Sequence, residues 1–473
     1  MSVENANKTY SEMLPIWDEM DDVCGGERAV KAKTIAYLPM ICGCDDPEEE
    51  RRYYDSYLNR AVFYPSAKNT LENNVGLAFA EDPSFEPDGL DFLKSDADGA
   101  GTSLYQQNQT AHSYLMKYGR GGFFVDYPSV EGGVSKSDVV QRGIRPTVVL
   151  YSPKNIINWR VRKVNGVYKT CLVVLYEETS QVDPQDEFKE KIVKIYRVLR
   201  LDEQNKYCMQ VYSDESGAIT ANDPIYPRNA KGQLWSEIPF QVIGSESNSW
   251  NVQPIPIEPV AMVNLAHYRN SAEYEQTIFY AGQVQPVINE LDDNALQYLN
   301  AVDENGRKVN PIVLGSQSVL TLPQGSNFNF VKADEGTIAK EGMTEKLQYM
   351  QLLGAKINDI NEVAKTATQS DNEQMTKHSV LSLCVSNLNE AMEKVLRWVA
   401  QYYGSGDKAK FTIKQDFAKG KLSLEDMKFW QSEFANQSIS AETYFYIKKN
   451  GKIPEIDYEE EQKRIDAEKS AII

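Results

Sequence analysis

The feature that most constrains the fold is a stretch of about six helical turns between Val263 and Gln283, VNLAHYRNSAEYEQTIFYAGQ. Its apolar and small residues recur at helical spacings and form two stripes rather than one. The first stripe contains Ala261, Leu265, Tyr268, Ala272 and Phe279, and the second contains His267, Tyr274, Ile278 and Ala281. A helix that is half-apolar on two faces needs a packing partner on each side. Those partners lie either within one large domain or in a partner helix and a second subunit.

Composition allows a large folded protein and limits its partners. The chain has 473 residues, of which 41% are hydrophobic and 25% charged, so it can bury a sizeable core. Its formal net charge is −18, which disfavours lasting contact with nucleic acid or with an anionic membrane surface. The N-terminus has no signal-peptide pattern, and no apolar run is long enough to predict a transmembrane helix. Six cysteines are too few for a disulfide framework, which fits a reducing cytoplasm.

The first half of the chain mixes helices with strands. Asp46 is a predicted N-cap and Pro47 the first residue of a helix that Pro65 should stop, and a second helix is expected within residues 69–80. A helix with one apolar face is expected near residues 104–118, ended by glycines and followed by a buried strand. From about residue 146 the pattern predicts an antiparallel meander, with a hairpin turn at Asn165-Gly166.

The second half is dominated by long helices. The opening stretch and a helix over residues 338–363 flank a β-rich region at 284–335. A third long helix is expected from about Met375 to Tyr403, after a polar loop at 364–377. Its predicted core face is Leu381, Cys384, Leu388, Met392, Val395 and Val399. The C-terminal region is expected to be helical and ends in an acidic, charge-dense run.

Motifs for catalysis are missing from the sequence. There is no P-loop, no G-x-S-x-G elbow and no H-E-x-x-H pair. The three histidines, His112, His267 and His378, are interpreted as satisfied or solvated side chains rather than metal ligands. Residues 96–101, DADGAG, resemble a calcium loop but are better explained as a turn, and Cys42 and Cys44 as ordinary thiols. We therefore expect no catalytic residues, no cofactor, no bound metal and no enzymatic activity.

Five stretches, in order along the chain, resemble the portal proteins of tailed bacteriophages, which form the ring-shaped head-to-tail connector. They are YLNRAVFYPSAKNTLENNVGLAF, GAGTSLYQQNQTAHSYLMKYGRGGFFVDYP, EPVAMVNLAHYRNSAEYEQTIFYAGQVQPVI, LLGAKINDINEVAKTAT and ISAETYFYIKKNGKIPEIDYEEEQKRI. The resemblance covers nearly the whole chain and implies an α+β fold with portal-like architecture. The implied parts are a mixed α/β wing at 1–255, a first stem helix at 256–284, a small β-containing clip at 285–336, a second stem helix at 337–363, a tunnel loop at 364–377, a long wing helix at 378–404 and a short helical crown at 405–473.

The same resemblance implies a function and a set of partners. Portals form a ring, here expected to contain twelve subunits, at one vertex of the capsid. The ring is the conduit for DNA packaging and ejection, and double-stranded DNA passes through it without sequence-specific contact. The implied protein partners are the large subunit of the terminase motor, a head–tail adaptor, the major capsid protein and a scaffold protein. The expected location is the virion, with the host cytoplasm during assembly and no membrane contact.

Three sets of residues follow by position from the resemblance. The stem is expected to pack between subunits through Leu265, Tyr268, Ala272, Tyr274, Ile278 and Phe279. The tunnel loop is expected to present Lys365, Gln369, Asp371, Asn372, Glu373 and Lys377 to DNA, although an ordinary solvated loop has the same composition. The clip is expected to dock its partners through a hairpin tip, with the strand 312–322 beside it. The tip residues are Glu304, Asn305, Arg307 and Lys308.

Two other functions stay open. The β-rich middle and 27 tyrosines are compatible with another virion structural protein, such as a tail or adhesion component. The long helices argue against it, because tail fibres are dominated by strands. A packaging enzyme is the second alternative, and the missing P-loop argues against that one.

Overall fold

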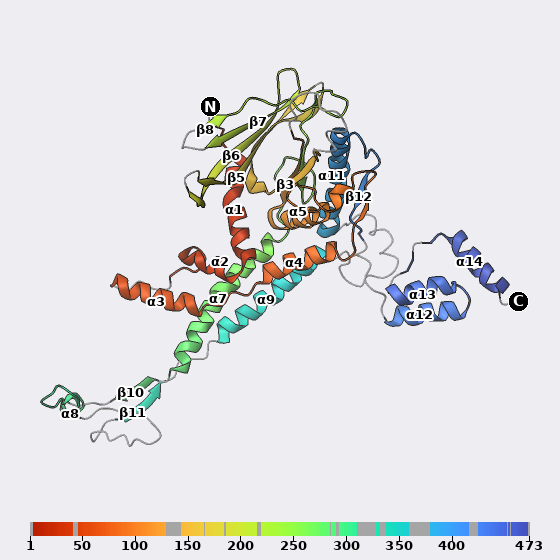
Figure 1. Ribbon diagram of the computed structural model, residues 1–473. Coiled ribbons are helices and arrows are strands. Elements are labelled where there is room, and N and C mark those ends of the chain that lie inside the picture. The colour runs from red at the N-terminus through yellow and green to blue at the C-terminus, as the bar shows by residue number, and fades with distance from the viewer. Residues whose placement is uncertain are drawn as a thin grey trace. The chain divides into compact units, whose positions relative to one another are not determined.

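The structure is a computed structural model that describes residues 3–40, 46–128, 143–164, 166–183, 186–214, 219–283, 285–289, 293–309, 327–331, 337–358, 379–415, 424–451, 453–454 and 456–471. It is a mixed α/β protein, as the sequence predicts (Figure 1). The chain divides into two units. The first contains Met1–Met20, Asn69–Glu258 and Gly354–Ile473, and the second contains Asp21–Lys68 and Pro259–Leu353.

The helices are α1 (Lys8–Gly25), α2 (Glu27–Ala32), α3 (Pro47–Arg60), α4 (Ser66–Ala78), α5 (Leu104–Tyr118), α7 (Glu258–Gly282), α8 (Asp293–Asn300), α9 (Thr337–Asn358), α11 (Val380–Tyr403), α12 (Leu424–Ala435), α13 (Ala441–Asn450) and α14 (Tyr458–Ala471), with 3-10 turns at Thr34–Ala36, Asp91–Lys94 and Pro153–Asn155. The strands are β1 (Ser84–Glu86), β2 (Arg120–Asp126), β3 (Thr147–Tyr151), β4 (Ile156–Val164), β5 (Val167–Asp183), β6 (Asp186–Leu201), β7 (Tyr207–Asp214), β8 (Ile219–Ala221), β9 (Phe240–Gly244), β10 (Gln285–Asn289), β11 (Asn327–Val331) and β12 (Lys410–Thr412).

The core of the first unit is a three-stranded antiparallel sheet in the order β3-β2-β9. Helices α5 and α11 pack against this sheet and against each other. The predicted face of α11 is confirmed, because Leu381, Val395 and Val399 are at most 1% exposed. Ser379 caps the start of α11, and Gly404 ends it in the left-handed conformation that glycine favours.

A second sheet in the same unit is the predicted antiparallel meander, in the order β4-β5-β6-β7-β8. Val164 pairs with Val167, so the hairpin expected at Asn165-Gly166 is confirmed, and Gly166 has the positive φ of 86° that such a turn needs. Arg197 on β6 joins this sheet to the first, because its guanidinium donates to Asp126 on β2 as well as to Glu177 on β5.

Helices α12, α13 and α14 form a small group stabilised by capping. The Ser440 hydroxyl accepts from Thr443 N–H at the start of α13, and the Glu461 carboxylate on α14 accepts from Ser440 N–H at 2.7 Å. Ile447 and Ile465 are its buried apolar residues, at 0% and 6% exposed. The group agrees with the helical C-terminal region expected from the sequence.

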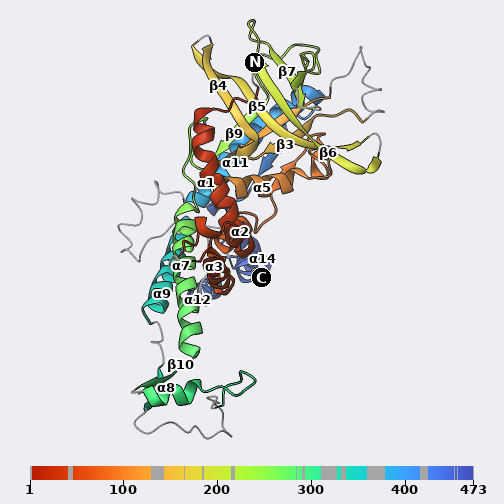
Figure 2. The same ribbon diagram turned by 90° about the vertical axis from the view of Figure 1, so that its left-hand side faces the viewer.

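The second unit is built around two long helices, α7 and α9, which lie side by side in both views (Figures 1 and 2). Helices are thus confirmed within the ranges 256–284 and 337–363, as far as Asn358 on the second, and their role as a stem stays a prediction. In α3, the predicted cap is confirmed because Asp46 accepts from Glu48 N–H at 2.9 Å, and Pro47 is the first helical residue. Helix α3 ends at Arg60, five residues earlier than the stop expected at Pro65.

Two features of the second unit differ from the expectations. Residues 21–68, placed in the wing from sequence, belong to the same unit as α7 and α9. The region at 285–336 contains a helix, α8, that the sequence analysis missed, together with the β10–β11 pair. Helix α8 has only eight residues, too few for a periodic pattern to separate it from a turn.

Candidate assembly surface

Helix α7 is held by polar side chains that the sequence analysis did not single out. Asn264 is fully buried; its amide oxygen accepts from Ala67 N–H at 3.0 Å, and its amide nitrogen donates to the Tyr64 carbonyl at 2.8 Å. The Ser271 hydroxyl accepts from Val62 N–H at 3.4 Å. These bonds satisfy backbone groups of segment 61–67, which comprises the connection after α3 and the first residues of α4 and pairs with no described strand. Segment 61–67 of the same chain therefore covers one side of α7.

Further along α7, Gln276 continues this row of contacts. Its side-chain oxygen accepts from the Arg60 guanidinium at 2.5 Å, and its nitrogen donates to the Tyr53 hydroxyl at 3.0 Å. The Arg60 guanidinium also lies 4.1 Å from the ring centre of Phe279. The polar residues within this half-apolar helix were the only sequence signal for these contacts. They could not identify the partners, which lie some 200 residues away in sequence.

Three of the six residues expected to pack between subunits are core residues of the single chain. Leu265, Tyr268 and Ala272 are 3%, 0% and 0% exposed. The Tyr268 ring packs edge-on against Phe63, with ring centres 5.8 Å apart. Because these side chains have no free surface, the expected contact with a neighbouring subunit is wrong for them. The reason is that segment 61–67 folds over the face they occupy.

The other three expected residues lie near the end of α7 and keep free surface. Tyr274 is half-buried, while Ile278 and Phe279 are 44% and 39% exposed. Ile278 and Phe279 belong to a larger set of exposed apolar side chains on α7 and α9, which we name the helix-pair surface. Its members are Met262, Ile278, Phe279, Tyr280, Ile338, Tyr349 and Leu352.

The predicted hairpin tip at 304–308 is a tight turn with exposed side chains. Asp303 organises it, because its carboxylate accepts from Asn305 N–H at 2.9 Å and from Arg307 N–H at 2.8 Å. Gly306 has a positive φ of 75°, as a turn of this shape requires. All four tip residues named from sequence, Glu304, Asn305, Arg307 and Lys308, are exposed. The strand expected at 312–322 lies outside the described residues.

The tunnel-loop residues also lie outside the described residues. They are Lys365, Gln369, Asp371, Asn372, Glu373 and Lys377. Cys42 and Cys44 and the histidine His378 fall outside as well.

The structure explains the acidic turn at 96–101 without a metal. Asp96 accepts from Gly99 N–H at 2.7 Å and from Gly101 N–H at 2.9 Å, and it pairs with Arg145. Asp98 accepts from the backbone of Ala100 at 2.8 Å. Within the part of the chain that the structure describes, no group of three or more His, Cys, Asp or Glu side chains is placed to hold a metal ion. None of the described helices is long and apolar enough to span a membrane.

The histidine interpretation needs a correction. His112 on α5 is 0% exposed, and neither ring nitrogen has a hydrogen-bond partner among the described residues, so it is neither solvated nor satisfied. Burial lowers its pKa from 6.5 to about 4. His267 on α7 is 1% exposed and lies against Tyr64, with ring centres 4.6 Å apart. Burial, with Lys346 nearby, lowers the pKa of His267.

Comparison with known proteins gives distant matches only. The profile of a domain of unknown function, DUF4055, matches residues 256–403, the region from α7 to α11. No curated protein matches.

Solved structures of gene transfer agent (GTA) particles overlap most of the chain at low identity. A chain from the neck of an empty GTA particle, computed with C6 symmetry, has 11% identity and a TM-score of 0.39, covering 83% of this chain and 92% of that one. A chain from the virion of the native particle has 11% identity and a TM-score of 0.38, covering 88% and 97%. A chain from the native neck with C12 symmetry has 9% identity and a TM-score of 0.36, covering 93% and 98%. These TM-scores are too low to establish a shared fold.

Proposed function

We propose that the protein is a non-enzymatic subunit of a portal, the ring at one vertex of a tailed-phage capsid through which DNA is packaged and ejected. The observation that carries the proposal is the helix-pair surface, on which Ile278, Leu352 and Ile338 are 44%, 52% and 85% exposed. We take these exposed apolar side chains of α7 and α9 as a contact with another protein, because such side chains mark interaction sites where they form a patch. In a ring, each subunit contacts the next through such a surface.

The remaining assignments follow the resemblance by position. Helices α7 and α9 serve as the stem, residues 285–336 as the clip and 405–473 as the crown. The exposed turn at 304–308 docks the terminase large subunit and later the head–tail adaptor, because its side chains of both signs lie free of the fold. The segment 364–377 faces the DNA. Contacts with the major capsid protein and a scaffold protein place the ring in the virion.

The charge of the chain suits a conduit. A net charge of −18 per subunit repels the phosphate backbone on average, so DNA slides past without being held. A protein that bound DNA tightly would neutralise phosphates with lysine and arginine and stall the motor. Hydrolysis of nucleotide is then the task of the terminase, and the purified protein should show none.

The first experiment is to measure the particle mass of the purified protein by light scattering and to image it by negative stain. We expect rings of about a dozen subunits with a central hole. The double variant Ile278→Asp with Leu352→Asp should reduce the particle to a monomer or small oligomer, because each substitution places a charge in the subunit contact. Tyr168→Asp is the matched control, since Tyr168 is 73% exposed but lies on β5 in the other unit.

Three outcomes count against the proposal. A stable trimer would favour a tail component over a portal. Rings that survive the double variant unchanged would show that the helix-pair surface does not hold subunits together. Loss of the rings in Tyr168→Asp as well would remove the distinction between the two surfaces. Circular dichroism of each variant establishes that a change in mass is not a loss of fold.

A further inference from the structure

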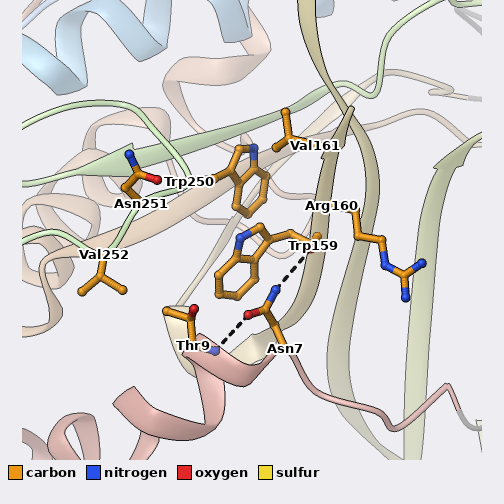
Figure 3. A pocket seen from close by; sticks show the side chains of 8 residues that line it. All are labelled: Asn7, Thr9, Trp159, Arg160, Val161, Trp250, Asn251 and Val252. Atoms are coloured by element: carbon orange, nitrogen blue, oxygen red, sulfur yellow. Dashed lines mark hydrogen bonds between the residues drawn. The ribbon is translucent and has the colours of Figure 1, made fainter. Parts of the chain in front are cut away.

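A pocket of about 360 Å³ lies in the first unit, beside two tryptophans (Figure 3). Three parts of the chain line it: the start of α1, strand β4 and the connection that follows β9. Its lining residues are Asn7, Thr9, Trp159, Arg160, Val161, Trp250, Asn251 and Val252. The rings of Trp159 and Trp250 are stacked, with centres 5.6 Å apart and planes 18° apart. The volume is within the range of small-molecule sites.

Arg120, at the start of β2, lies against both rings. Its guanidinium carbon is 4.4 Å from the ring centre of Trp159 and 5.7 Å from that of Trp250. The side chain is 3% exposed, and none of its three guanidinium nitrogens has a hydrogen-bond acceptor among the described residues. Burial lowers the pKa of Arg120 to about 10. At neutral pH the group is therefore a buried cation without a described counter-ion.

The other partly buried arginine of these sheets shows what Arg120 lacks. Arg197 donates to Asp126 at 2.8 Å and to Glu177 at 3.1 Å. Contact with aromatic rings offers Arg120 about 2 kcal/mol when desolvated, whereas removing an ion from water costs several kcal/mol. The Arg120 guanidinium thus keeps three donors without an acceptor among the described residues, although the chain has 68 acidic residues.

We propose that this pocket binds a small oxyanion carried on a planar group, with the planar group stacked on the tryptophans and the oxyanion on Arg120. A guanidinium presents a fork of N–H donors that matches a carboxylate or phosphate at two points. Indole rings accept a flat ligand by stacking. None of the eight lining residues is Asp or Glu, so no carboxylate at the pocket repels an anion.

The oxyanion reaches Arg120 when the ring of Trp250 shifts. Trp250 lies on a connection without strand or helix, between β9 and α7, and its neighbour Val252 is 43% exposed. Its indole N–H donates to the Thr170 hydroxyl at 2.9 Å. The Trp250 ring also stacks on Phe240, with ring centres 5.8 Å apart. A ligand whose own ring replaces the contact between the two indoles therefore shifts Trp250 relative to Trp159 and Phe240. This shift makes Trp250 a reporter of binding.

The test is a titration of the full-length protein followed by tryptophan fluorescence and by melting temperature. Three probes test the oxyanion and the planar group separately. Inorganic phosphate has the oxyanion alone, whereas benzoate and a nucleoside monophosphate carry an oxyanion together with a planar group. We expect saturable quenching and a raised melting temperature, with both planar anions binding more tightly than inorganic phosphate. Arg120→Met should weaken the tighter planar anion by about 10- to 100-fold, the range for a lost charge-assisted hydrogen bond. Trp250→Phe should remove most of the fluorescence change.

Arg162→Met is the matched control, because Arg162 is an exposed arginine on β4, the strand that carries Trp159, and does not line the pocket. It should bind as the unmodified protein does. A further readout separates a ligand site from a structural contact. Without ligand, Arg120→Met should melt no lower than the unmodified protein, because it removes a buried cation that lacks a counter-ion.

Four results would overturn the proposal. One is the absence of a saturable response to all three probes up to about 10 mM, well above the millimolar affinity of a weak site. Another is equal binding by Arg120→Met and the unmodified protein. The third is a clear loss of melting temperature in Arg120→Met without ligand, which would make Arg120 a structural support for the tryptophans. Phosphate binding as tight as that of the nucleoside monophosphate would refute recognition of the planar group.

Discussion

His112 makes the stability of the first unit depend on pH in a way that one substitution tests. The residue lies on α5, is 0% exposed, and faces Phe79 with ring centres 6.1 Å apart. Burial lowers its pKa from 6.5 to about 4. The folded protein therefore keeps this imidazole neutral at pH values where the unfolded chain binds a proton.

The sign and size of the effect follow from proton linkage. The contribution to stability is fully present above pH 6.5 and is lost as pH falls toward about 4, because only the unfolded state gains the proton in this range. At about 1.36 kcal/mol per pKa unit, a difference of about 2.5 units removes roughly 3 kcal/mol. His112→Leu abolishes this term. At neutral pH the leucine, of similar volume, also removes a buried N–H that lacks an acceptor, so we expect no loss of stability there.

The assay is urea unfolding of the unmodified protein and of His112→Leu at pH 7 and at pH 4.5, followed by tryptophan fluorescence. The unmodified protein should lose about 2.5 kcal/mol more than the variant between the two pH values. The contributions of the other titrating groups to this pH-dependent loss cancel in the comparison, because both proteins carry those groups. Equal losses in the two proteins would mean that His112 is hydrated or accepts a proton inside the fold, and the reasoning from burial would be refuted.

Other substitutions test single contacts. Asn264→Leu leaves the Ala67 N–H without its partner and removes one of two hydrogen bonds to the Tyr64 carbonyl. It should lower the free energy of unfolding by about 1–3 kcal/mol in urea titrations, and a loss well below about 1 kcal/mol would mean that water replaces the amide. Gly119→Ala should cost about 2–4 kcal/mol in the same assay, because φ is 73° and a Cβ would lie 2.7 Å from the Pro254 carbonyl oxygen; an unchanged midpoint would contradict this geometry. Burial by itself would raise the pKa of Glu461. Its hydrogen bonds, of which the one from Ser440 N–H has the largest effect, lower the pKa below its usual value. The ionised Glu461 carboxylate therefore stabilises the start of α13 above pH 4.5, and this contribution is lost as the pH falls below that value. Glu461→Gln should flatten the acid-induced loss of helix that circular dichroism measures. An unaltered acid profile in the variant would mean that this cap does not cause the loss.

The elements that could be predicted from sequence are those defined by neighbours in the chain. Asp46 and Pro47 begin α3 because a cap needs only the next few residues. The Asn165-Gly166 hairpin and the face of α11 are local patterns of the same kind. Helix α8 was missed because eight residues do not establish a period.

The candidate assembly surface could be predicted only in part. The tip at 304–308 and the residues Ile278 and Phe279, which the sequence analysis assigned to contacts with other proteins, are exposed on the chain, and those contacts stay predictions. The sequence could not separate these exposed residues from Leu265 and Tyr268, because a periodic pattern reports that a side chain is buried and not which segment buries it. The separation depends on segment 61–67, whose backbone bonds to α7 join residues far apart in sequence.

The polar residues of α7 join it to the rest of the second unit, and exposed apolar residues near its end belong to the surface that we assign to assembly. Asn264, Ser271 and Gln276 each have a hydrogen-bond partner in the same chain. Beyond Gln276 come three exposed apolar residues in succession, Ile278, Phe279 and Tyr280. At about 100° per residue these side chains span roughly 200° of the helix, more than one flat partner covers. A subunit in a closed ring has a neighbour on each of two sides, and the two contacts use different surfaces. The breadth of this apolar surface is therefore a property that the proposed ring needs, whereas in a two-fold dimer a single patch faces its own copy.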